Sequence, residues 1–414
     1  MTAVTNFDYD IVIAGGGMIG TTLSLALAPL ELRIAVVEPI ARAERQQPSF
    51  DDRSTALSRS SQRTFEAMGL WEEISAAATP IRSIHVSERG RFGFSHIDAA
   101  EQNVEALGYV VINRVLGDVL QRALTRVEEI DWICPGKITA VECAGDHATV
   151  NVSSPAGGTQ LSCRLLVAAD GANSSVRDMI GISAGRSDYR QTAVIGNLLP
   201  DIAPDNRAFE RFTDLGPLAM LPVAGERAAF VWILPPSAAE SVLQLSDEAF
   251  TERLQEAFGL RLGKFSKVGQ RAAYPLTLTR ANGLIARRSV VVGNAAHGLH
   301  PVAAQGFNLG VRDVAALCDC IAGAQASASG EPDPGAALVL EAYAAWRKAD
   351  QSKLVRFTDG IVRLFGSQRR PVRVLRNIGM LGFDLIPGVR TAFAKHTMGL
   401  AGRLPRLSRG VPLK

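Results

Sequence analysis

The chain has 414 residues, of which 47% are hydrophobic and 21% are charged, and its formal net charge at pH 7 is +3. That length is enough for two or three domains with a substantial core, so a fibrous or disordered protein is excluded. The balanced composition also gives no sign of a nucleic-acid-binding protein, and we expect no nucleic acid among the partners.

The cysteine content and the N-terminus indicate a cytoplasmic protein without a metal site. The five cysteines are odd in number and include no CxxC pair: Cys134, Cys143, Cys163, Cys318 and Cys320. Such a set favours neither a disulfide framework nor a zinc site. No cleavable signal sequence is evident, because Asp8 and Asp10 precede the first apolar run.

The uncharged stretch from residue 11 to 30 is long enough to cross a bilayer, at about 20 residues. Its first half is rich in β-branched residues, its second half is rich in Ala and Leu, and glycines separate the two. This pattern predicts a buried strand, a tight turn and a helix rather than a membrane span.

The turn itself reads Gly15-Gly16-Gly17-Met18-Ile19-Gly20, which matches GxGxxG. In this motif Gly15 permits the turn, Gly17 lets a pyrophosphate approach the backbone, and Gly20 lets the helix pack closely on the strand. The second predicted strand, residues 33 to 37, ends in Glu38, where a carboxylate can accept hydrogen bonds from ribose hydroxyls. The pattern predicts an adenine dinucleotide, with an ordinary α/β turn as the alternative, and it does not separate NAD from FAD.

A further predicted strand begins at Leu165 and runs into Asp170-Gly171, and a helix starts shortly after. The plain structural explanation is a strand closed by a turn, with Ser174 or Ser175 capping the helix. The same turn can also border a cofactor site, because the two roles do not conflict.

Residues 186 to 271 predict a second β-rich unit. Apolar and polar residues alternate over 192 to 199, 216 to 223 and 228 to 234, and a helix is expected at 247 to 258. We expect this sheet to present Phe212, Met220, Pro222 and Trp232 to a substrate, although such residues are more often plain core.

The segment from residue 290 to 313 contains a strand, the turn Gly293-Asn294, then Pro301 and the run Gln305-Gly306-Phe307-Asn308 at the start of a helix. A glycine-rich turn at a helix start can direct N–H groups towards an anionic oxygen of a cofactor. His297 and His300 lie in the same segment but have no nearby Cys or carboxylate partner in the sequence, so they make a poor metal site.

The segments at 165 to 177 and 290 to 313 resemble the DG and GD motifs of class A flavoprotein monooxygenases. The whole chain resembles the ubiquinone-biosynthesis hydroxylases of that class. The family marks are the segments 52 to 58, 107 to 111, 209 to 212, 216 to 222, 257 to 263 and 274 to 276. Two positions depart from the usual motifs, because Asn294 replaces Asp and Ala304 replaces Gly, although the family itself includes the Gly-Asn variant.

The resemblance implies an α/β fold, with a Rossmann-like FAD-binding domain of the glutathione-reductase type, an inserted mixed β-sheet substrate domain and C-terminal helices. The pieces expected are 1–75, 105–185 and 272–335 for the FAD domain, 76–104 and 186–271 for the substrate domain, and 336–414 for the helices. The resemblance also implies that Arg53 lies against the FAD. Asn113 opens a helix over 114 to 124 and, by the same resemblance, reaches the pyrophosphate or ribityl chain. The alternative is that Asn113 is simply the N-cap of that helix.

The function implied is hydroxylation of a polyprenylated phenol or quinol in ubiquinone biosynthesis, with O2 as co-substrate and NAD(P)H or a ferredoxin-type protein as electron donor. The flavin carries the chemistry, so no catalytic residue is assigned. Two alternatives stay open, namely an FAD-dependent prenyl-chain reductase and a non-catalytic lipid-binding escort that retains the fold.

The C-terminal segment is strongly basic. From residue 351 to 414 it contains 13 Lys and Arg against only two Asp. Apolar residues recur at helical spacing around 354 to 365, and most of the basic residues lie off that stripe. We expect this region to contact the anionic inner face of the membrane or a biosynthetic complex there, whereas the simpler interpretation is a solvated charged face.

Overall fold

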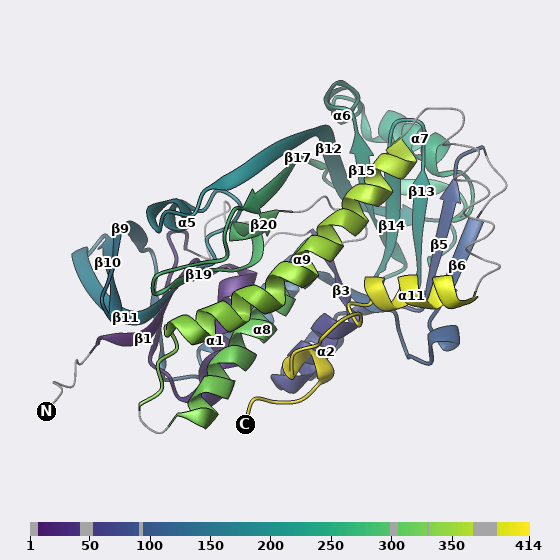
Figure 1. The fold of residues 1–414 in the computed structure, drawn as a ribbon. Coiled ribbons are helices and arrows are strands. Elements are labelled where there is room, and N and C mark those ends of the chain that lie inside the picture. The colour runs from purple at the N-terminus through teal and green to yellow at the C-terminus, as the bar shows by residue number, and fades with distance from the viewer. Residues whose placement is uncertain (1–6, 42–52, 91–93, 299–304, 329–330, 367–386) are drawn as a thin grey trace, which may run out of the picture.

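The computed structural model describes residues 7–41, 53–90, 94–298, 305–328, 331–366 and 387–414, which form two large β-sheets with helices packed on both (Figure 1). Among these residues the first sheet has eight strands and the second has nine. The strands of the first sheet are β1 (Tyr9–Ala14), β2 (Ile34–Val37), β8 (Ile130–Ile133), β9 (Lys137–Ala144), β10 (His147–Ser154), β11 (Gly157–Ala168), β18 (Ile285–Ala286) and β19 (Ser289–Val291). Strands β19, β11, β1, β2 and β8 run parallel in that order.

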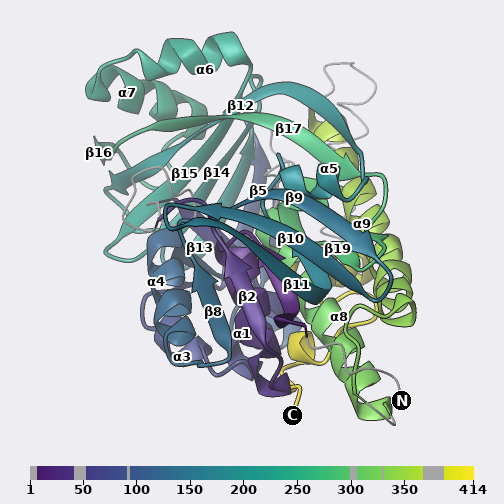
Figure 2. The ribbon, with the colours of Figure 1, turned by 90° about the vertical axis from the view of Figure 1, so that its left-hand side faces the viewer.

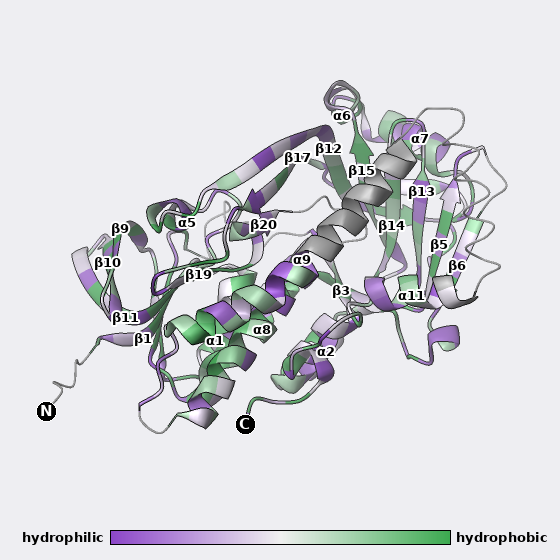
Figure 3. Ribbon diagram, viewed as in Figure 1, coloured by the Kyte–Doolittle hydropathy of each residue, from purple (hydrophilic) through white to green (hydrophobic). Residues whose placement is uncertain are grey.

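The central strands of the first sheet are covered on both faces. Ile11 and Ile13 of β1 lie in the core beneath the helices, whereas Val12 and Ala14 lie in a second core on the opposite face. The helices of the first face are α1 (Met18–Leu27), α4 (Asn113–Leu124), α8 (Gln305–Ser327) and α9 (Ala337–Gly366), while α5 (Ser175–Met179) and the β9–β10 hairpin cover the second. Figure 3 shows apolar residues gathered in α8 and the first turns of α9.

The second sheet is joined to the first by the long antiparallel pair β12 and β17, which arches over the molecule in Figure 2. Its order is β20-β17-β12-β15-β14-β13-β5-β6, with β16 beside β12. The bounds are β5 (Ser83–Glu88), β6 (Phe94–Asp98), β12 (Ala184–Pro200), β13 (Arg207–Phe212), β14 (Pro217–Val223), β15 (Arg227–Leu234), β16 (Phe265–Val268), β17 (Ala272–Ala281) and β20 (His297–Gly298).

The two faces of the second sheet are covered differently. Helices α6 (Pro236–Leu243) and α7 (Asp247–Phe258) seal the outer face, where Trp232 packs against Phe250. On the inner face lies a small sheet of β3 (Ser54–Ser58), β7 (Gly108–Ile112) and β4 (Thr79–Ile81), which continues into α2 (Arg59–Ala67) and α3 (Trp71–Ser75) of the first layer. The small sheet contacts the inner face through Val110, which packs near Ala208.

The expected elements are largely confirmed. The stretch from 11 to 30 forms β1, a glycine turn and α1, and the strands and helix predicted within 186–271 correspond to β12, β14, β15 and α7. Helix α8 ends at Ser327, and the apolar stripe expected around 354–365 belongs to α9, which runs without a break from Ala337 to Gly366. Among the described helices, none has the length and apolar character needed to cross a membrane.

The C-terminal residues pack back onto the first layer. Leu407 and Leu413 are buried in its main core, and α11 (Pro387–Thr397) lies beside the small helical turn at residues 100–102. Three basic residues of this region form ion pairs within the chain: Arg390 with Glu101, Arg406 with Asp319, and Lys414 with Glu31. A fourth, Arg403, stacks on Trp346.

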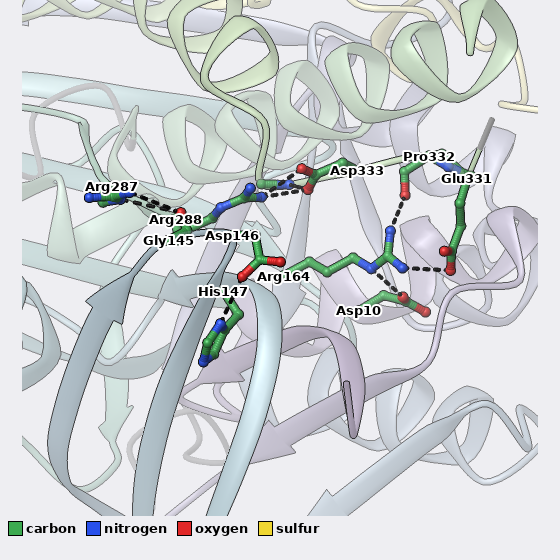
Figure 4. Close-up of polar contacts among 11 residues, drawn as sticks. Asp10, Gly145, Asp146, His147, Arg164, Arg287, Arg288, Glu331, Pro332 and Asp333 are labelled. Atoms are coloured by element: carbon green, nitrogen blue, oxygen red, sulfur yellow. Dashed lines mark hydrogen bonds and ion pairs between the residues drawn. The ribbon is translucent and has the colours of Figure 1, made fainter. Parts of the chain in front are cut away.

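Charged residues gather at the amino ends of the parallel strands (Figure 4). Arg164 bonds Asp10 at 3.5 Å and Glu331 at 2.5 Å, and its side chain also donates to the carbonyl oxygen of Pro332. Arg288 holds both oxygens of Asp333 at 2.7 Å. These pairs attach the loop before α9 to the edge of the first sheet.

Candidate active site

The motifs of the sequence meet at the carboxyl edge of the first sheet. Ala14 at the end of β1 is in register with Ala168 of β11 and Val37 of β2. Ala168 is in turn in register with Val291 of β19. Because the carboxyl ends of parallel strands lie at one edge, the turns that follow these strands are neighbours. In open parallel sheets this edge is the usual place for a nucleotide.

Glycine is required at three positions of the first turn. A Cβ atom on Gly15 would lie 2.7 Å from the carbonyl oxygen of Ala169, and its φ of +99° disfavours any L side chain. A Cβ on Gly16 would lie 2.2 Å from the ring of Trp132. One on Gly20 would lie 1.9 Å from the carbonyl oxygen of Gly15. These three positions of the turn therefore leave no room for side chains.

The N-terminus of α1 and the carboxylate of Glu38 face the same edge. Gly17 precedes the helix in an extended conformation, and no side chain caps the first turn. Its N–H groups and the positive end of the helix dipole suit an anion. Glu38 is 7% exposed, and its Oε atoms accept hydrogen bonds from the N–H groups of Gly16 at 2.7 Å and Ile40 at 3.0 Å. The carboxylate is thus held directly beyond β2.

The Asp170-Gly171 turn is organised by the start of α5. The carboxylate of Asp170 accepts hydrogen bonds from the Ser174 hydroxyl and from the N–H of Val176 at 3.1 Å. Ser174 caps α5, as one of the two caps expected, and Gly171 has a φ of +88°. Asp170 therefore has a structural role in addition to its place at the edge.

Arg177 joins two of the motifs, which the sequence did not indicate. It is almost fully buried, and its guanidinium donates to the carbonyl oxygens of Ala172 at 3.2 Å and Ala295 at 3.1 Å. The DG turn and the GD turn are fixed to one another by this side chain.

A buried ion-pair network lies beneath Gly293. Asp313 of α8 accepts from the N–H of Gly293 at 3.0 Å, from His297 Nε2 at 2.6 Å and from Arg347 Nε of α9 at 2.7 Å. Burial alone would raise the pKa of Asp313, but the charges and hydrogen bonds of His297 and Arg347 outweigh it and hold that pKa well below its usual range. His297 is thereby oriented by a carboxylate that is distant in sequence, and Asn294 next to Gly293 is exposed.

Ile19 packs the first motif against the last. A Cβ on Gly293 would lie 3.1 Å from the Ile19 side chain, and one on Gly310 of α8 would lie 2.7 Å from it. Met18 is partly buried at the rim of the same core. Both residues act by packing around the turn.

The start of α8 is tied to the small sheet through Asn308. Its Oδ1 accepts from the N–H of Ser58 and the hydroxyl of Ser61, both at 2.8 Å, and its Nδ2 donates to the carbonyl oxygen of Ala56 at 2.8 Å. Gly306 and Phe307 are partly accessible at the helix start. Pro301 and the side chain of Gln305, both expected at the cofactor, lie outside the described residues.

Arg53 and Asn113 are neighbours at the start of β3. The N–H of Asn113 donates to the carbonyl oxygen of Arg53 at 2.8 Å, and its Oδ1 accepts from the Thr55 hydroxyl at 2.6 Å. Asn113 is the first residue of α4 rather than its cap, which is Ile112. The guanidinium of Arg53 lies 4.8 Å from the ring centre of Tyr274, which extends from the second sheet.

The four residues expected at the substrate lie on opposite faces of the second sheet. Met220, Pro222 and Trp232 share the outer face, where Met220 and Trp232 belong to the core beneath α6 and α7. This placement argues against a substrate contact, because residues at even positions of β14 and β15 point towards α6 and α7 and away from the small sheet. Phe212 shares its face of β13 with Ala208, which contacts the small sheet.

The inner face carries a different set of side chains. Ala219, Leu221, Val231 and Ile195 are all partly accessible, whereas their outer-face neighbours Leu218 and Met220 are buried. An accessible apolar surface that faces another layer of the same chain is suited to an apolar ligand. The alternation of the sequence indicated the strands but did not distinguish the inner face from the outer one.

The residues at the carboxyl edge fit FAD. The glycine turn, in which added Cβ atoms would clash, and the uncapped start of α1 suit a pyrophosphate. The buried carboxylate of Glu38 suits a ribose. In the described part of the chain, His, Cys, Asp and Glu side chains form no group of three that could hold a metal ion.

Comparison with known proteins agrees with this geometry. A family model described as an FAD binding domain matches residues 8–358. The solved structure of p-nitrophenol 4-monooxygenase PnpA from Pseudomonas putida shares the fold, with a TM-score of 0.78 over 95% of this chain and 98% of that one at 19% identity. The chain therefore belongs to the proteins with this FAD binding domain and has the two-domain fold of that monooxygenase.

Two curated relatives narrow the class to a family. Ubiquinone hydroxylase UbiL of Rhodospirillum rubrum is 35% identical, covering 98% of this chain and 93% of its own length. The 3-demethoxyubiquinol 3-hydroxylase of Escherichia coli is 30% identical, covering 96% of this chain and 100% of its own length. The chain belongs to the FAD-dependent hydroxylases of ubiquinone biosynthesis.

Proposed function

We propose that the enzyme transfers one oxygen atom from O2 to the aromatic ring of a polyprenylated phenol or quinol. The observation that carries this proposal is the pairing of two surfaces, a nucleotide-binding edge on the first sheet and an accessible apolar face on the second. The names of the curated relatives refer to ubiquinone and demethoxyubiquinol, which are polyprenylated rings. An apolar ring with a long apolar chain suits a face lined by Ala219, Leu221, Val231 and Ile195.

We assign the cofactor contacts from the geometry of the edge. The pyrophosphate lies on the turn of Gly15 and Gly17 at the start of α1, and Glu38 bonds the adenosine ribose. Asp170 and the Gly293-Asn294 turn bond the ribityl chain, and Arg53 lies beside the ring system together with the start of α8. FAD supplies the oxygen activation, for which no side chain has the chemistry. The protein positions the ring and excludes water.

The electron donor is proposed to be NAD(P)H or a ferredoxin-type protein. The dinucleotide turn at Gly15 is taken up by FAD in this assignment, and the sequence contains no second GxGxxG of that kind. Bleaching of the flavin absorbance under anaerobic conditions by NADH, NADPH or a reduced ferredoxin identifies the donor directly.

The test of the reaction uses the FAD-loaded enzyme with a 2-polyprenylphenol, the donor so identified and isotopically labelled O2. We expect a product heavier by one labelled oxygen atom. A product that gains two hydrogens instead would identify a prenyl-chain reductase and refute the hydroxylation, and a protein that retains no flavin would support an escort role.

We also propose that the basic C-terminal region contacts an anionic membrane surface, where a polyprenylated substrate is held. Of the described cations in this region, three are paired within the chain and one is stacked on Trp346. The exposed side chains of Lys395 and Arg409 make no pair within the described residues. A closer cluster of four cations in the sequence, Arg369, Arg370, Arg373 and Arg376, lies outside the described residues, and we choose it as the candidate surface. Near such a surface each cation contributes about 1 kcal/mol before screening by salt.

Charge reversal tests this contact better than truncation, because Leu407 and Leu413 belong to the core. We expect a variant with Glu at the four candidate positions to lose salt-sensitive flotation with anionic liposomes. The control reverses four exposed cations elsewhere, namely Arg227, Lys264, Lys267 and Arg280, and should float like the natural protein. Equal flotation of the two variants would refute the proposed surface.

A further inference from the structure

A single carboxyl group, that of Glu210, is placed on the inner face of β13 among apolar side chains. Phe209 faces outwards and belongs to the core beneath α7, so by alternation Glu210 faces inwards together with Ala208. Across the sheet Glu210 is in register with Ala219 of β14 and Val86 of β5. Neither neighbour can accept or donate a hydrogen bond through its side chain.

Glu210 has no partner among the described residues and is nevertheless not sealed in a core. Within the described residues it takes part in no hydrogen bond or ion pair, and its side chain is partly accessible although protein surrounds it. Asp313 makes the contrast, since that fully buried carboxylate accepts three strong hydrogen bonds. Carboxyl groups enclosed by protein are normally paired, so an unpaired one that remains accessible is suited to a ligand.

The surroundings also set the proton affinity of this group. Burial raises the pKa of Glu210 from its ordinary value of 4.5 to about 7, and no nearby charge contributes. The nearest charged residue in register on this face is Glu88, which pairs with Phe212. Both protonation states of Glu210 are therefore populated near neutral pH, as required of a group that takes up and returns a proton.

The two histidines of this region do not face the space that Glu210 borders. His85 and His96 bond one another across β5 and β6, and His85 packs against Phe209 on the outer face. The small sheet, by contrast, packs on the inner face at Ala208, two residues from Glu210. Ala56 of that sheet packs in the same cluster as Ala208, and its carbonyl oxygen accepts from Asn308 at the start of α8. Glu210 therefore lies two residues from a contact that leads directly to the start of α8.

We propose that Glu210 binds the ring hydroxyl of the substrate and accepts its proton during hydroxylation. The proposal rests on the phenolic substrate proposed above and adds the residue that recognises it. A carboxylate accepts a hydrogen bond from a phenol and cannot do so from the corresponding methyl ether, which has no proton to donate. The apolar neighbours Ala219 and Val86 would hold the ring beside it.

The proton movement balances over the reaction. As the ring carbon ortho or para to the hydroxyl bonds the incoming oxygen, ring electrons form that bond and the hydroxyl proton passes to Glu210, leaving a carbonyl. The carbon is oxidised and the oxygen, supplied by the monooxygenase reaction, is reduced. The same carbon then loses its hydrogen as a proton to solvent, and Glu210 returns its proton to the carbonyl oxygen. The ring is aromatic again, and Glu210 ends as it began.

The test compares Glu210→Gln and Glu210→Leu with a matched control, Glu252→Gln, which changes an exposed carboxyl of α7. The probes are 2-allylphenol and its methyl ether, 2-allylanisole, with binding to the full-length FAD-loaded protein followed by the change in flavin absorbance. We expect the natural protein and the control to bind the phenol roughly tenfold more tightly than the ether. Glu210→Leu should discriminate less than about twofold.

Glu210→Gln separates binding from proton transfer. Its amide oxygen still accepts a hydrogen bond but takes up no proton, so phenol binding is largely kept. The share of consumed O2 recovered as hydroxylated product should fall roughly tenfold or more, and hydrogen peroxide should take its place. A Gln variant that couples O2 consumption to product as well as the natural enzyme would refute the role as proton acceptor.

Melting temperature gives a readout that needs no substrate. The pKa of Glu210 is higher in the folded state than in the unfolded state, so ionisation of this group favours unfolding. The resulting loss of stability grows between pH 4.5 and about 7 and is complete above that range. At pH 8 Glu210→Gln should therefore melt above the natural protein, and at pH 4 the two should agree. A lower melting temperature at pH 8 would show that the carboxylate has a stabilising partner and would overturn the proposal.

The outcomes also distinguish this proposal from the hydroxylase function. If Glu210→Leu discriminates between phenol and ether as the natural protein does, Glu210 does not bind the hydroxyl, whatever product is formed. If the natural enzyme discriminates as expected but forms no oxygenated product with any donor, the hydroxylation and the proton transfer are refuted, and binding of the hydroxyl by Glu210 stands.

Discussion

The two ends of the parallel strands in the first sheet carry opposite kinds of chemistry. At the amino edge, charged side chains pair with one another near solvent, as Arg288 does with Asp333 (Figure 4). At the carboxyl edge, the strands end in turns that present backbone N–H groups, and the charge cluster there is centred on the fully buried Asp313. The same strands thus begin with pairs that attach a loop and end in a surface open to a ligand.

The difference teaches which contacts matter for function. Partly exposed ion pairs contribute less to stability than fully buried ones, because water and salt screen them and two side chains must be ordered. A buried network is costly to break, because any remaining charge has no substitute partner. Substitutions at the carboxyl edge should therefore affect cofactor binding and stability strongly, and substitutions at the amino edge should affect both weakly.

The largest effect is expected from Gly15→Val, which should abolish retention of FAD. A branched side chain at this φ of +99° would clash with the carbonyl oxygen of Ala169 and occupy the turn on which the pyrophosphate lies. The measurement is the flavin-to-protein ratio after gel filtration, with folding checked by circular dichroism. The control, Gly323→Val, changes an exposed helical glycine with no atom within 4 Å and should keep its flavin. A folded Gly15→Val protein with normal flavin content would contradict the assignment of this turn.

Next in size is Asp313→Ala, which leaves His297 and Arg347 without their buried partner. We expect the free energy of unfolding to fall by about 3 to 5 kcal/mol, measured by urea denaturation of the flavin-free protein. Because the pKa of Asp313 is depressed in the folded state, its contribution is complete above the unfolded value of 3.8 and is lost only as the pH falls towards the folded value. A loss of stability below 1 kcal/mol at pH 7 would show that the network is not a structural anchor.

A smaller effect is expected from Asp170→Ala, with Asn294→Ala as its comparison. Asp170 contributes a charged acceptor and also bonds the N–H of Val176 at the start of α5. Asn294 is exposed and brings a neutral acceptor. We expect FAD to dissociate roughly tenfold more readily from the first variant and only about twofold to threefold from the second. The reverse ranking of the two dissociation constants would contradict the assigned roles.

The carboxyl edge could be predicted from sequence because its geometry demands particular residues at short spacing. Gly15, Gly17 and Gly20 follow a strand within one turn, and Glu38 ends the next strand, so local pattern was sufficient. The Asp313 network was missed because its partners come from three separate elements. His297 and Arg347 are 16 and 34 residues from Asp313 in sequence, and only the fold brings them together.

The second sheet shows a different limit. Alternation in β14 and β15 correctly indicated strands, but period two does not say which phase faces the ligand. Met220 and Trp232 were expected at the substrate, with plain core as the commoner explanation, and the structure places them in the core beneath α6 and α7. The open phase contains smaller residues and Glu210, and their accessibility depends on which layer covers each face.

The smallest effect is expected at the amino edge, from the pair of Arg288 and Asp333. The guanidinium holds both carboxylate oxygens at 2.7 Å, and the two side chains are 13% and 33% exposed. Asp333 also accepts from the N–H of Gly335, so a single Asp333→Ala change removes more than the pair.

A double-mutant cycle with Ala at both positions isolates the interaction, and we expect a coupling of about 1 kcal/mol or less that declines in high salt. The dissociation constant of FAD should stay within about twofold in all three variants, because the pair lies at the end of the strands opposite the cofactor turns. A coupling above about 3 kcal/mol, or a marked loss of flavin, would show that the amino edge is linked to the cofactor site and that the two ends of the sheet are not independent.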